Sequence, residues 1–154
     1  RLVRFASEDV GLADPMALPK AIAAQQSVHF LGMPEGALAL AELTVYLALA
    51  PKSNAIYRAW GEVRQDIANT RNDPIPMHLR NAPTKLMQEM GYGKGYRYAH
   101  DYEGGVVGQQ NLPENLEGKS YYHPTDRGFE RELGERLARI HEIYDRTTDS
   151  EDTE

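Results

Sequence analysis

Aromatic and basic side chains alternate over residues 92–102, where Lys94 and Arg97 stand beside Tyr96 and Tyr98. Proteins bind single-stranded nucleic acid with this combination, because rings stack on bases and cations meet phosphates. Tyrosines at even spacing can equally cover a core and hydrogen-bond a loop, since tyrosine has an apolar body and a polar tip. A nucleic-acid or partner contact and a scaffold role therefore both stay open for this segment.

Two more cations, Arg80 and Lys85, precede residues 92–102 and would extend the same basic surface. The segment 78–102, called here the basic tyrosine segment, is the candidate docking surface. Its candidate contacts to nucleic acid or to a partner are Arg80, Lys85, Lys94, Tyr96, Arg97 and Tyr98.

Two glycine-containing stretches resemble phosphate-binding loops without completing the pattern. Gly118-Lys119-Ser120 looks like the end of a P-loop, but Pro113 occupies the position of the first glycine and removes a backbone N–H. Residues 91–95 have the wrong spacing for a dinucleotide-binding fingerprint and follow a helix instead of a strand. We expect a helix cap followed by a turn there, and no nucleotide site in either stretch.

Catalytic and metal-binding patterns are missing from the sequence. His100-Asp101 would need further His and Asp ligands to form a metal site, and the other histidines are scattered. We expect His100 and Asp101 to hold the loop in place. There is no cysteine and no nucleophile elbow. The sequence therefore predicts no catalytic, cofactor-binding or metal-binding residue, and a stand-alone hydrolase is kept only as a formal alternative.

Apolar spacing, caps and Pro/Gly breaks predict an all-α fold with about five helices in a compact array. Asp14 is expected to cap the first helix, Ser53 the third, and Asn81 or Pro83 to open the fourth. The long stretch 91–124 shows no helical period and holds six of the nine tyrosines, so it should be an irregular loop rich in glycine and tyrosine. The expected helices cover residues 14–32, 34–50, 53–67, 81–91 and 128–146.

Two of these helices carry conspicuous apolar residues. Residues 34–50 are apolar on all sides, which predicts a buried central helix. The stripe on the last helix, from Phe129 to Tyr144, suits either an internal core or a subunit interface.

Composition fits an ordinary globular protein, with 41% hydrophobic and 26% charged residues in 154. No stretch approaches the ~20 apolar residues of a membrane-spanning helix, and we expect no membrane association. The net charge of −6 argues against a dedicated DNA-binding domain, because phosphate contacts dominate that affinity. Because the chain begins with Arg1, we expect it to be a piece of a longer protein. We expect one domain over residues 1–146 and a disordered acidic tail over 147–154.

Four separated motifs, in order, carry a family resemblance over roughly residues 1–140. They are ASEDVGLADP at 6–15, VYLA at 45–48 with APKSN at 50–54, HLRNAPT at 78–84, and GYG at 91–93 with YAHDY at 98–102. Together they resemble the C-terminal region of the replication-associated recombination protein A family. This family is also called the maintenance of genome stability protein A family, and its eukaryotic relatives include the Werner helicase-interacting protein.

The resemblance implies a helical domain, similar to the collar of clamp-loader subunits, that assembles a homo-tetramer. It implies an AAA+ module upstream that binds ATP and Mg²⁺, and a parent ATPase that acts in DNA replication, recombination and repair at stalled forks. Its implied partners are its own AAA+ module, DNA and single-stranded DNA-binding protein, in the cytoplasm at the nucleoid. Since this chain has no Walker motif and no sensor arginine, we expect a non-catalytic tetramerisation domain. The alternative is a docking module for DNA or protein that uses residues 78–102.

Overall fold

The computed structural model describes residues 1–71 and 73–149, and these residues form helices and irregular segments with no β-strand among them. The predicted all-α fold is confirmed. Contacts between Cα atoms divide the chain into two compact units. Unit 1 consists of residues 1–64 and 121–135, and unit 2 of residues 65–120 and 136 onward. That one domain covers residues 1–146 stays a prediction.

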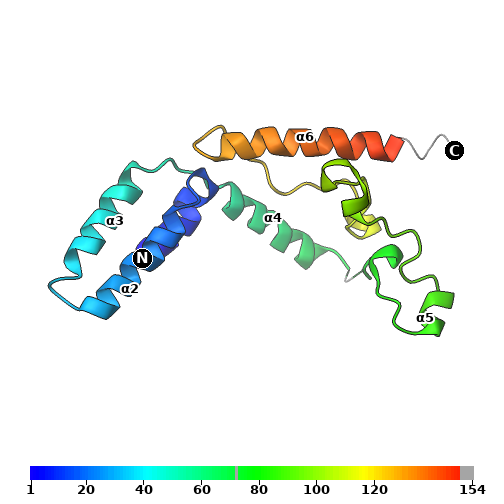
Figure 1. Ribbon diagram of the computed structural model, residues 1–154, viewed down its shortest axis with the longest axis horizontal. Coiled ribbons are helices and arrows are strands. Elements are labelled where there is room, and N and C mark those ends of the chain that lie inside the picture. The colour runs from blue at the N-terminus through cyan, green and yellow to red at the C-terminus, as the bar shows by residue number, and fades with distance from the viewer. Residues whose placement is uncertain (72, 150–154) are drawn as a thin grey trace. The chain divides into compact units, whose positions relative to one another are not determined.

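Unit 1 is built on two long helices, α2 (Ala17–Leu31) and α3 (Ala37–Leu49), which lie side by side (Figure 1). The chain reaches them through α1 (Leu2–Phe5), a π-helix (Ala6–Val10) and a 3-10 turn (Gly11–Ala13). Small side chains let these backbones approach closely, and burial of their apolar surface stabilises the unit. The core consists of Ala6, Val10, Ala17, Ala21, Ala24, Leu43 and Leu47.

Glycine is required in the turn between α2 and α3. Gly32 adopts φ +76°, in the left-handed region that L side chains rarely occupy. A Cβ on Gly36 would lie 2.8 Å from the backbone oxygen of Gly32 and 3.0 Å from the Cα of Val28. The two helices can therefore reverse direction this tightly only with glycine at both positions.

The first predicted cap acts differently from the expectation. Asp14 accepts a 3.0 Å hydrogen bond from the backbone N–H of Met16, but α2 begins only at Ala17. The second carboxylate oxygen of Asp14 accepts a 2.5 Å hydrogen bond from the hydroxyl of Tyr46 on α3. Asp14 thus links the start of α2 to α3 in addition to closing the local turn.

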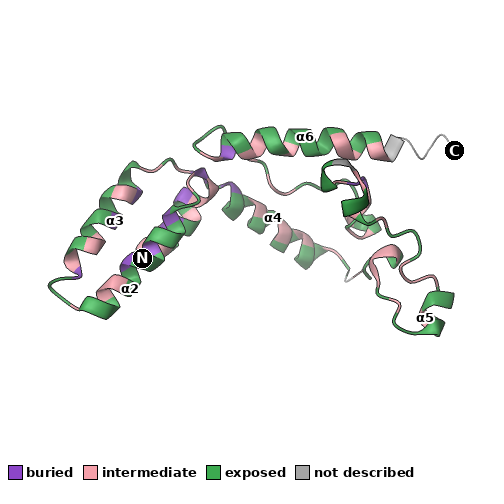
Figure 2. Ribbon diagram, in the orientation of Figure 1, coloured by how far each residue is buried: buried purple, intermediate pink, exposed green. Residues whose placement is uncertain are grey.

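The prediction of a buried central helix over 34–50 is wrong. Only Leu43 and Leu47 of α3 are buried, whereas Leu38 and Leu49 are 80% and 82% exposed. Figure 2 shows most of α3 in the colours of exposed and intermediate residues. An apolar pattern around the whole helix cannot show which sides other elements cover. In unit 1, α1, α2 and the π-helix are too few to surround α3.

Two further helices begin in unit 1. Helix α4 (Ala55–Asn69) starts where predicted, because the Ser53 hydroxyl accepts a 3.2 Å hydrogen bond from the backbone N–H of Ala55. Helix α6 (Glu130–Asp149) begins two residues after Gly128, the predicted start. A Cβ on Gly128 would lie 2.1 Å from the backbone oxygen of Ala13, so that segment can pass there only with glycine.

Unit 2 contains one short helix of its own, α5 (Lys85–Glu89), which Thr84 caps by accepting from the backbone N–H of Met87 at 3.3 Å. The stretch 91–124 contains no α-helix and no strand, as predicted. Unit 2 also contains 3-10 turns at Met77–Leu79, Ala99–Asp101, Glu103–Gly105 and Glu114–Leu116.

The last turns of α6 anchor the long loop of unit 2. The Tyr144 hydroxyl donates to the carbonyl of Gln109 at 2.7 Å, and the Thr147 hydroxyl accepts from the backbone N–H of Gly108 at 2.7 Å. Because α6 runs to Asp149, the start of the acidic tail expected at residue 147 is wrong. The rest of that expected tail, 150–154, lies outside the described residues. No helix in the described ranges is long and apolar enough to cross a membrane.

Candidate functional site

An apolar stripe runs along the exposed side of α3. Leu38, Val45 and Leu49 are spaced by seven and four residues, so their side chains lie on one face of the helix. They are 80%, 59% and 82% exposed, and the buried Leu43 and Leu47 point to the opposite side. At 1.5 Å per residue the stripe is about 16 Å long. We call it the α3 stripe.

More exposed apolar side chains follow at the end of α2 and in the turn to α3. Phe30 is 88%, Leu31 56% and Met33 65% exposed. Isolated apolar side chains on a surface are ordinary, whereas groups of them mark sites of interaction. The α3 stripe and the turn residues Phe30, Leu31 and Met33 together form what we call the unit 1 apolar surface.

Unit 1 also has a groove with a mainly apolar lining. Its volume is about 520 Å³, and residues of α1, α2 and α3 line it. Its polar members are Arg1, Gln25 and His29, and His29 belongs to no cluster of metal-ligating side chains among the described residues. Its apolar members are Leu2, Val3, Ala21, Val28, Leu40 and Leu43.

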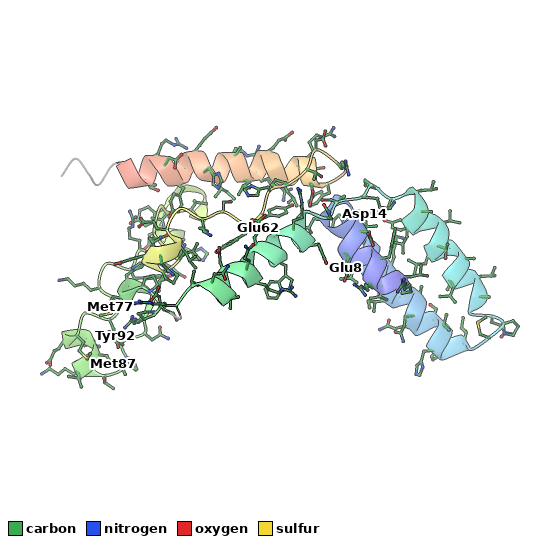
Figure 3. All side chains as sticks on the ribbon, turned by 180° about the vertical axis from the view of Figure 1, so that it is seen from behind. Glu8, Asp14, Glu62, Met77, Met87 and Tyr92 are labelled. Carbon is green, nitrogen blue, oxygen red and sulfur yellow. The ribbon has the colours of Figure 1, made fainter. Side chains whose placement is uncertain are left out.

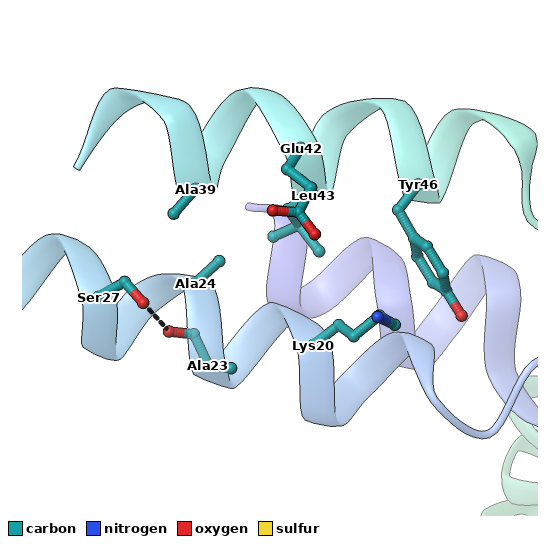
Figure 4. Close-up of a pocket in the computed structure, with 8 residues that line it drawn as sticks. All are labelled: Lys20, Ala23, Ala24, Ser27, Ala39, Glu42, Leu43 and Tyr46. Atoms are coloured by element: carbon teal, nitrogen blue, oxygen red, sulfur yellow. Dashed lines mark hydrogen bonds between the residues drawn. The ribbon is translucent and has the colours of Figure 1, made fainter. Parts of the chain in front are cut away.

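The pocket between α2 and α3 is smaller and more polar, with a volume of about 200 Å³ (Figure 4). The Lys20 ammonium lies 4.8 Å from the centroid of the Tyr46 ring, and the Tyr46 hydroxyl donates to Asp14. This hydrogen bond, together with burial and the charge of Asp14, raises the pKa of Tyr46. Lys20, Tyr46 and Asp14 satisfy one another, so this pocket is best explained as a polar link between the helices.

A buried carboxylate that the sequence pattern did not indicate lies where α4 and α6 begin. Glu130 is 0% exposed, and its Oε2 accepts hydrogen bonds from the Ser53 hydroxyl at 2.7 Å, the Thr125 N–H at 2.9 Å and the Thr125 hydroxyl at 2.7 Å. Its Oε1 accepts from the Tyr122 hydroxyl at 3.2 Å. We call Ser53, Tyr122, Thr125 and Glu130 the Glu130 network. The only sequence signal was an acidic residue in the first turn of a helix, which is common on exposed helices as well.

These hydrogen bonds shift the pKa values of two groups in the Glu130 network. Burial by itself would raise the pKa of Glu130, but the hydrogen bonds from Ser53, Thr125 and Tyr122 outweigh it and hold that pKa below its usual value of 4.5. Burial, the charge of Glu130 and the hydrogen bond to it raise the pKa of Tyr122 to about 12. Glu130 is thus held ionised as a structural acceptor. Ser53 also lines a cavity of about 380 Å³, but Glu130 itself is not among the lining residues of that cavity.

The structure separates the candidate residues of the basic tyrosine segment into engaged and exposed ones. The Nε of Arg80 donates to the carbonyl of Ile75 at 2.7 Å, and its guanidinium lies 5.2 Å from the Tyr92 ring (Figure 3 labels Tyr92). Arg97 donates to the carbonyl of Thr147 at 3.4 Å. Both arginines therefore serve in part to hold unit 2 together.

The other four candidates are more open to solvent. Lys85 forms an exposed ion pair with Glu89 at 3.9 Å, and Lys94 is exposed. Tyr96 and Tyr98 are 51% and 55% exposed. The Tyr98 ring also lies 5.0 Å from that of His100. A contact with nucleic acid or a partner by these six residues stays a prediction, and the two tyrosines are its most accessible rings.

The loops that resemble phosphate sites have structural roles in unit 2. The Lys119 ammonium contacts both carboxylate oxygens of Asp66, at 2.7 and 2.6 Å. Gly91 ends α5 with φ +85°, and the N–H of Tyr92 donates to the carbonyl of Met87 at 3.1 Å. Within residues 1–71 and 73–149 no group of three or more His, Cys, Asp or Glu side chains is placed to hold a metal ion.

Comparison with known proteins agrees with the motifs. The family model described as MgsA AAA+ ATPase C terminal matches residues 1–141. Replication-associated recombination protein A of Coxiella burnetii is 45% identical over 154 residues, covering 99% of this chain and 35% of the relative. The protein of the same name from Escherichia coli is 49% identical over 139 residues, covering 90% and 31%.

A eukaryotic relative is similar to the same region. ATPase WRNIP1 of Dictyostelium discoideum is 47% identical over 123 residues, or 79% of this chain and 14% of the relative. The chain spans about a third of the length of the two bacterial relatives. The family model covers nine-tenths of the chain, and these findings confirm the resemblance: the chain belongs to the MgsA AAA+ ATPase C-terminal family.

Proposed function

We propose that this chain is a non-catalytic oligomerisation domain that assembles an AAA+ ATPase into a homo-tetramer. The parent ATPase would act in DNA replication, recombination and repair at stalled forks, in the cytoplasm at the nucleoid. The names of the bacterial relatives support the connection to replication and recombination. ATP and Mg²⁺ would bind to the AAA+ module, which lies outside this chain.

The α3 stripe is the observation that carries the proposal. Full burial of a leucine or valine side chain contributes about 1.5–3 kcal/mol. Burial of the three exposed side chains of the α3 stripe would therefore contribute a large favourable free energy to association. A helix this apolar is unusual when it packs on one side only. A second copy of the unit 1 apolar surface would bury the stripe.

A copy of the same chain is the favoured occupant because the surface is poor in charge. Glu42 is the one residue of α3 that is charged at neutral pH, and matching apolar stripes can meet across a two-fold axis without opposing many like charges. Two such contacts per subunit, one through the α3 stripe and one through the turn residues or the groove, would be sufficient for a closed tetramer.

Light scattering on variants of this chain tests the role of the surface. We expect Leu38→Glu to lower the mean mass, because an inserted carboxylate would have to be buried unpaired in the interface. Phe30→Glu tests the turn in the same way. Gln65→Glu is the matched control, because it adds the same charge at an exposed residue of α4. It should leave the mean mass unchanged. If Leu38→Glu and Phe30→Glu both keep the parental mass, this surface is not the interface.

A docking role of the basic tyrosine segment is the second candidate, because the Tyr96 and Tyr98 rings are half exposed beside Lys94. Base stacking contributes about 1–3 kcal/mol per ring, so the double variant Tyr96→Ala/Tyr98→Ala should weaken single-stranded DNA binding at least tenfold. Tyr57→Ala, an equally exposed ring on α4, is the control. An absence of binding at low salt, where the phosphate contribution is greatest, dismisses this candidate.

A further inference from the structure

A cavity in unit 2 lies between residues 73–80 and residues 110–115 and has a volume of about 580 Å³. That size is within the range of pockets that enclose small ligands or single side chains with their backbone. The role proposed for unit 1 does not involve this cavity. Its wall is largely apolar and rich in proline, which fixes the backbone in advance. The apolar lining residues are Pro74, Ile75, Pro76, Met77, Leu112 and Pro113.

Two buried polar atoms on this cavity have no hydrogen-bond partner. They are the Nε2 of His78 and the Nε2 of Gln110. Among the described side chains these two are the buried nitrogen or oxygen atoms left without a partner, and both residues line the same cavity. An unmade hydrogen bond of a buried group destabilises the protein, so a ligand that offers acceptors to these two nitrogens would be stabilised by pairing them.

The charges around the cavity select the kind of ligand. Asp73 and Glu114 line it, and the one lining cation is Arg80. Arg80 already donates to the carbonyl of Ile75 and lies 3.5 Å from the Tyr92 hydroxyl. These neutral partners hold the guanidinium in place but leave its charge, so the lining has two carboxylates against one guanidinium. This excess of negative charge disfavours phosphates and carboxylates. A nucleobase is disfavoured for the same reason, since it would bring its phosphate with it.

We propose that this cavity binds an extended peptide segment of a partner protein in which an apolar side chain stands next to a lysine or arginine. The apolar side chain packs against the proline-rich wall. Peptide carbonyls accept from Gln110 and His78 once these side chains turn toward the ligand. The basic side chain of the peptide faces Asp73 and Glu114.

Two-dimensional NMR of the ¹⁵N-labelled chain tests the proposal with blocked pentapeptides. The first peptide has leucine at its centre followed by lysine, the second has glutamate in place of the lysine, and the third has alanine in place of the leucine. We expect the leucine–lysine peptide to shift the side-chain amide of Gln110 and the imidazole of His78. The other two peptides should bind at least tenfold more weakly.

Variants of the chain separate this site from unspecific contact. Gln110→Met keeps the shape but removes the amide donor, and we expect about fivefold to tenfold weaker binding of the leucine–lysine peptide. Leu112→Asp should abolish binding, whereas Asn111→Ala, exposed and outside the lining, should not change it. Circular dichroism melting of each variant shows that it is folded.

Three results would overturn the proposal. One is the absence of any shift at Gln110 and His78 with the leucine–lysine peptide at millimolar concentration. Another is equal binding of the glutamate peptide. The third is a response of the same resonances to thymidine monophosphate instead of the peptide, which would assign the cavity to a nucleotide.

Discussion

The hydroxyl of Ser53 donates a 2.7 Å hydrogen bond to the carboxylate of Glu130, a residue 77 positions away in the sequence. Ser53 precedes α4 and Glu130 begins α6, and both are buried. The same serine oxygen accepts from the N–H of Ala55, so one hydroxyl caps a helix and satisfies a buried charge. Within unit 1 this pair holds together two segments that are distant in the chain.

Removal of the carboxylate should destabilise unit 1. In Glu130→Ala the Ser53 hydroxyl, the Thr125 N–H and hydroxyl and the Tyr122 hydroxyl lose their acceptor. Because buried donors without a partner are costly, we expect the free energy of unfolding to fall by about 2–4 kcal/mol. Urea denaturation measures it, and Glu132→Ala, exposed on α6, should change it by less than about 0.5 kcal/mol. A similar small change in both variants contradicts the role of the Glu130 network.

The same carboxylate predicts how stability depends on acid. The folded chain holds the pKa of Glu130 below 4.5, so the ionised form favours folding. The contribution of Glu130 is therefore fully present above the unfolded pKa of 4.5 and is lost as the pH falls through the lower folded value. The difference in unfolding free energy between the parent and Glu130→Gln should be constant near neutral pH and shrink below about pH 4.5. A difference that grows on acidification contradicts this assignment.

At alkaline pH the predicted response comes from Tyr122. Its pKa is raised to about 12, so its protonated form is the one that the fold favours. Its contribution is present below the unfolded pKa of 10.0 and is lost as the pH rises toward 12. Absorbance at the phenolate band should show a tyrosine that titrates near 12 and is missing in Tyr122→Phe, whereas the raised pKa of Tyr46 remains in that variant. A late titration step that is the same in the parent and in Tyr122→Phe would be inconsistent with the hydrogen bond from Tyr122 to Glu130.

Two glycines give a matched pair of substitutions. Gly128 adopts φ +53°, and a Cβ there would lie 2.1 Å from the Ala13 oxygen and 2.7 Å from Pro51, so Gly128→Ala should cost on the order of 3 kcal/mol. Gly61 lies inside α4 with nothing within 4 Å of its Cβ position, so Gly61→Ala should stabilise by about 1 kcal/mol. Thermal melting of both variants checks that the two changes in stability have opposite signs. Similar destabilisation of both would contradict a specific requirement for glycine at position 128.

Local signals predicted the helices well, because caps and breaks act within a few residues. Ser53, Gly32 and Gly91 lie at helix ends as expected. The end of α6 was missed because Thr147 is polar, and its contact with Gly108 is not visible from local sequence. The Glu130 network was missed for the same reason, since its members come from separate segments.

The sequence did not indicate which apolar residues are buried. The pattern of α3 showed how apolar the helix is, but not which residues face a neighbour. The structure exposes Leu38, Val45 and Leu49, and so turns an expected core helix into a candidate interface. The family motif at residues 78–84 likewise gave no hint of the cavity that His78 and Arg80 line.

Sedimentation equilibrium of this chain at about 50 µM distinguishes a tetramer from a monomer, since a specific oligomer with micromolar affinity is well populated there. We expect a mass of four chains of 17.3 kDa each and a shift to smaller species in Leu38→Glu. A strict monomer at that concentration would contradict assembly through the unit 1 apolar surface, as would a tetramer that Leu38→Glu and Phe30→Glu leave intact.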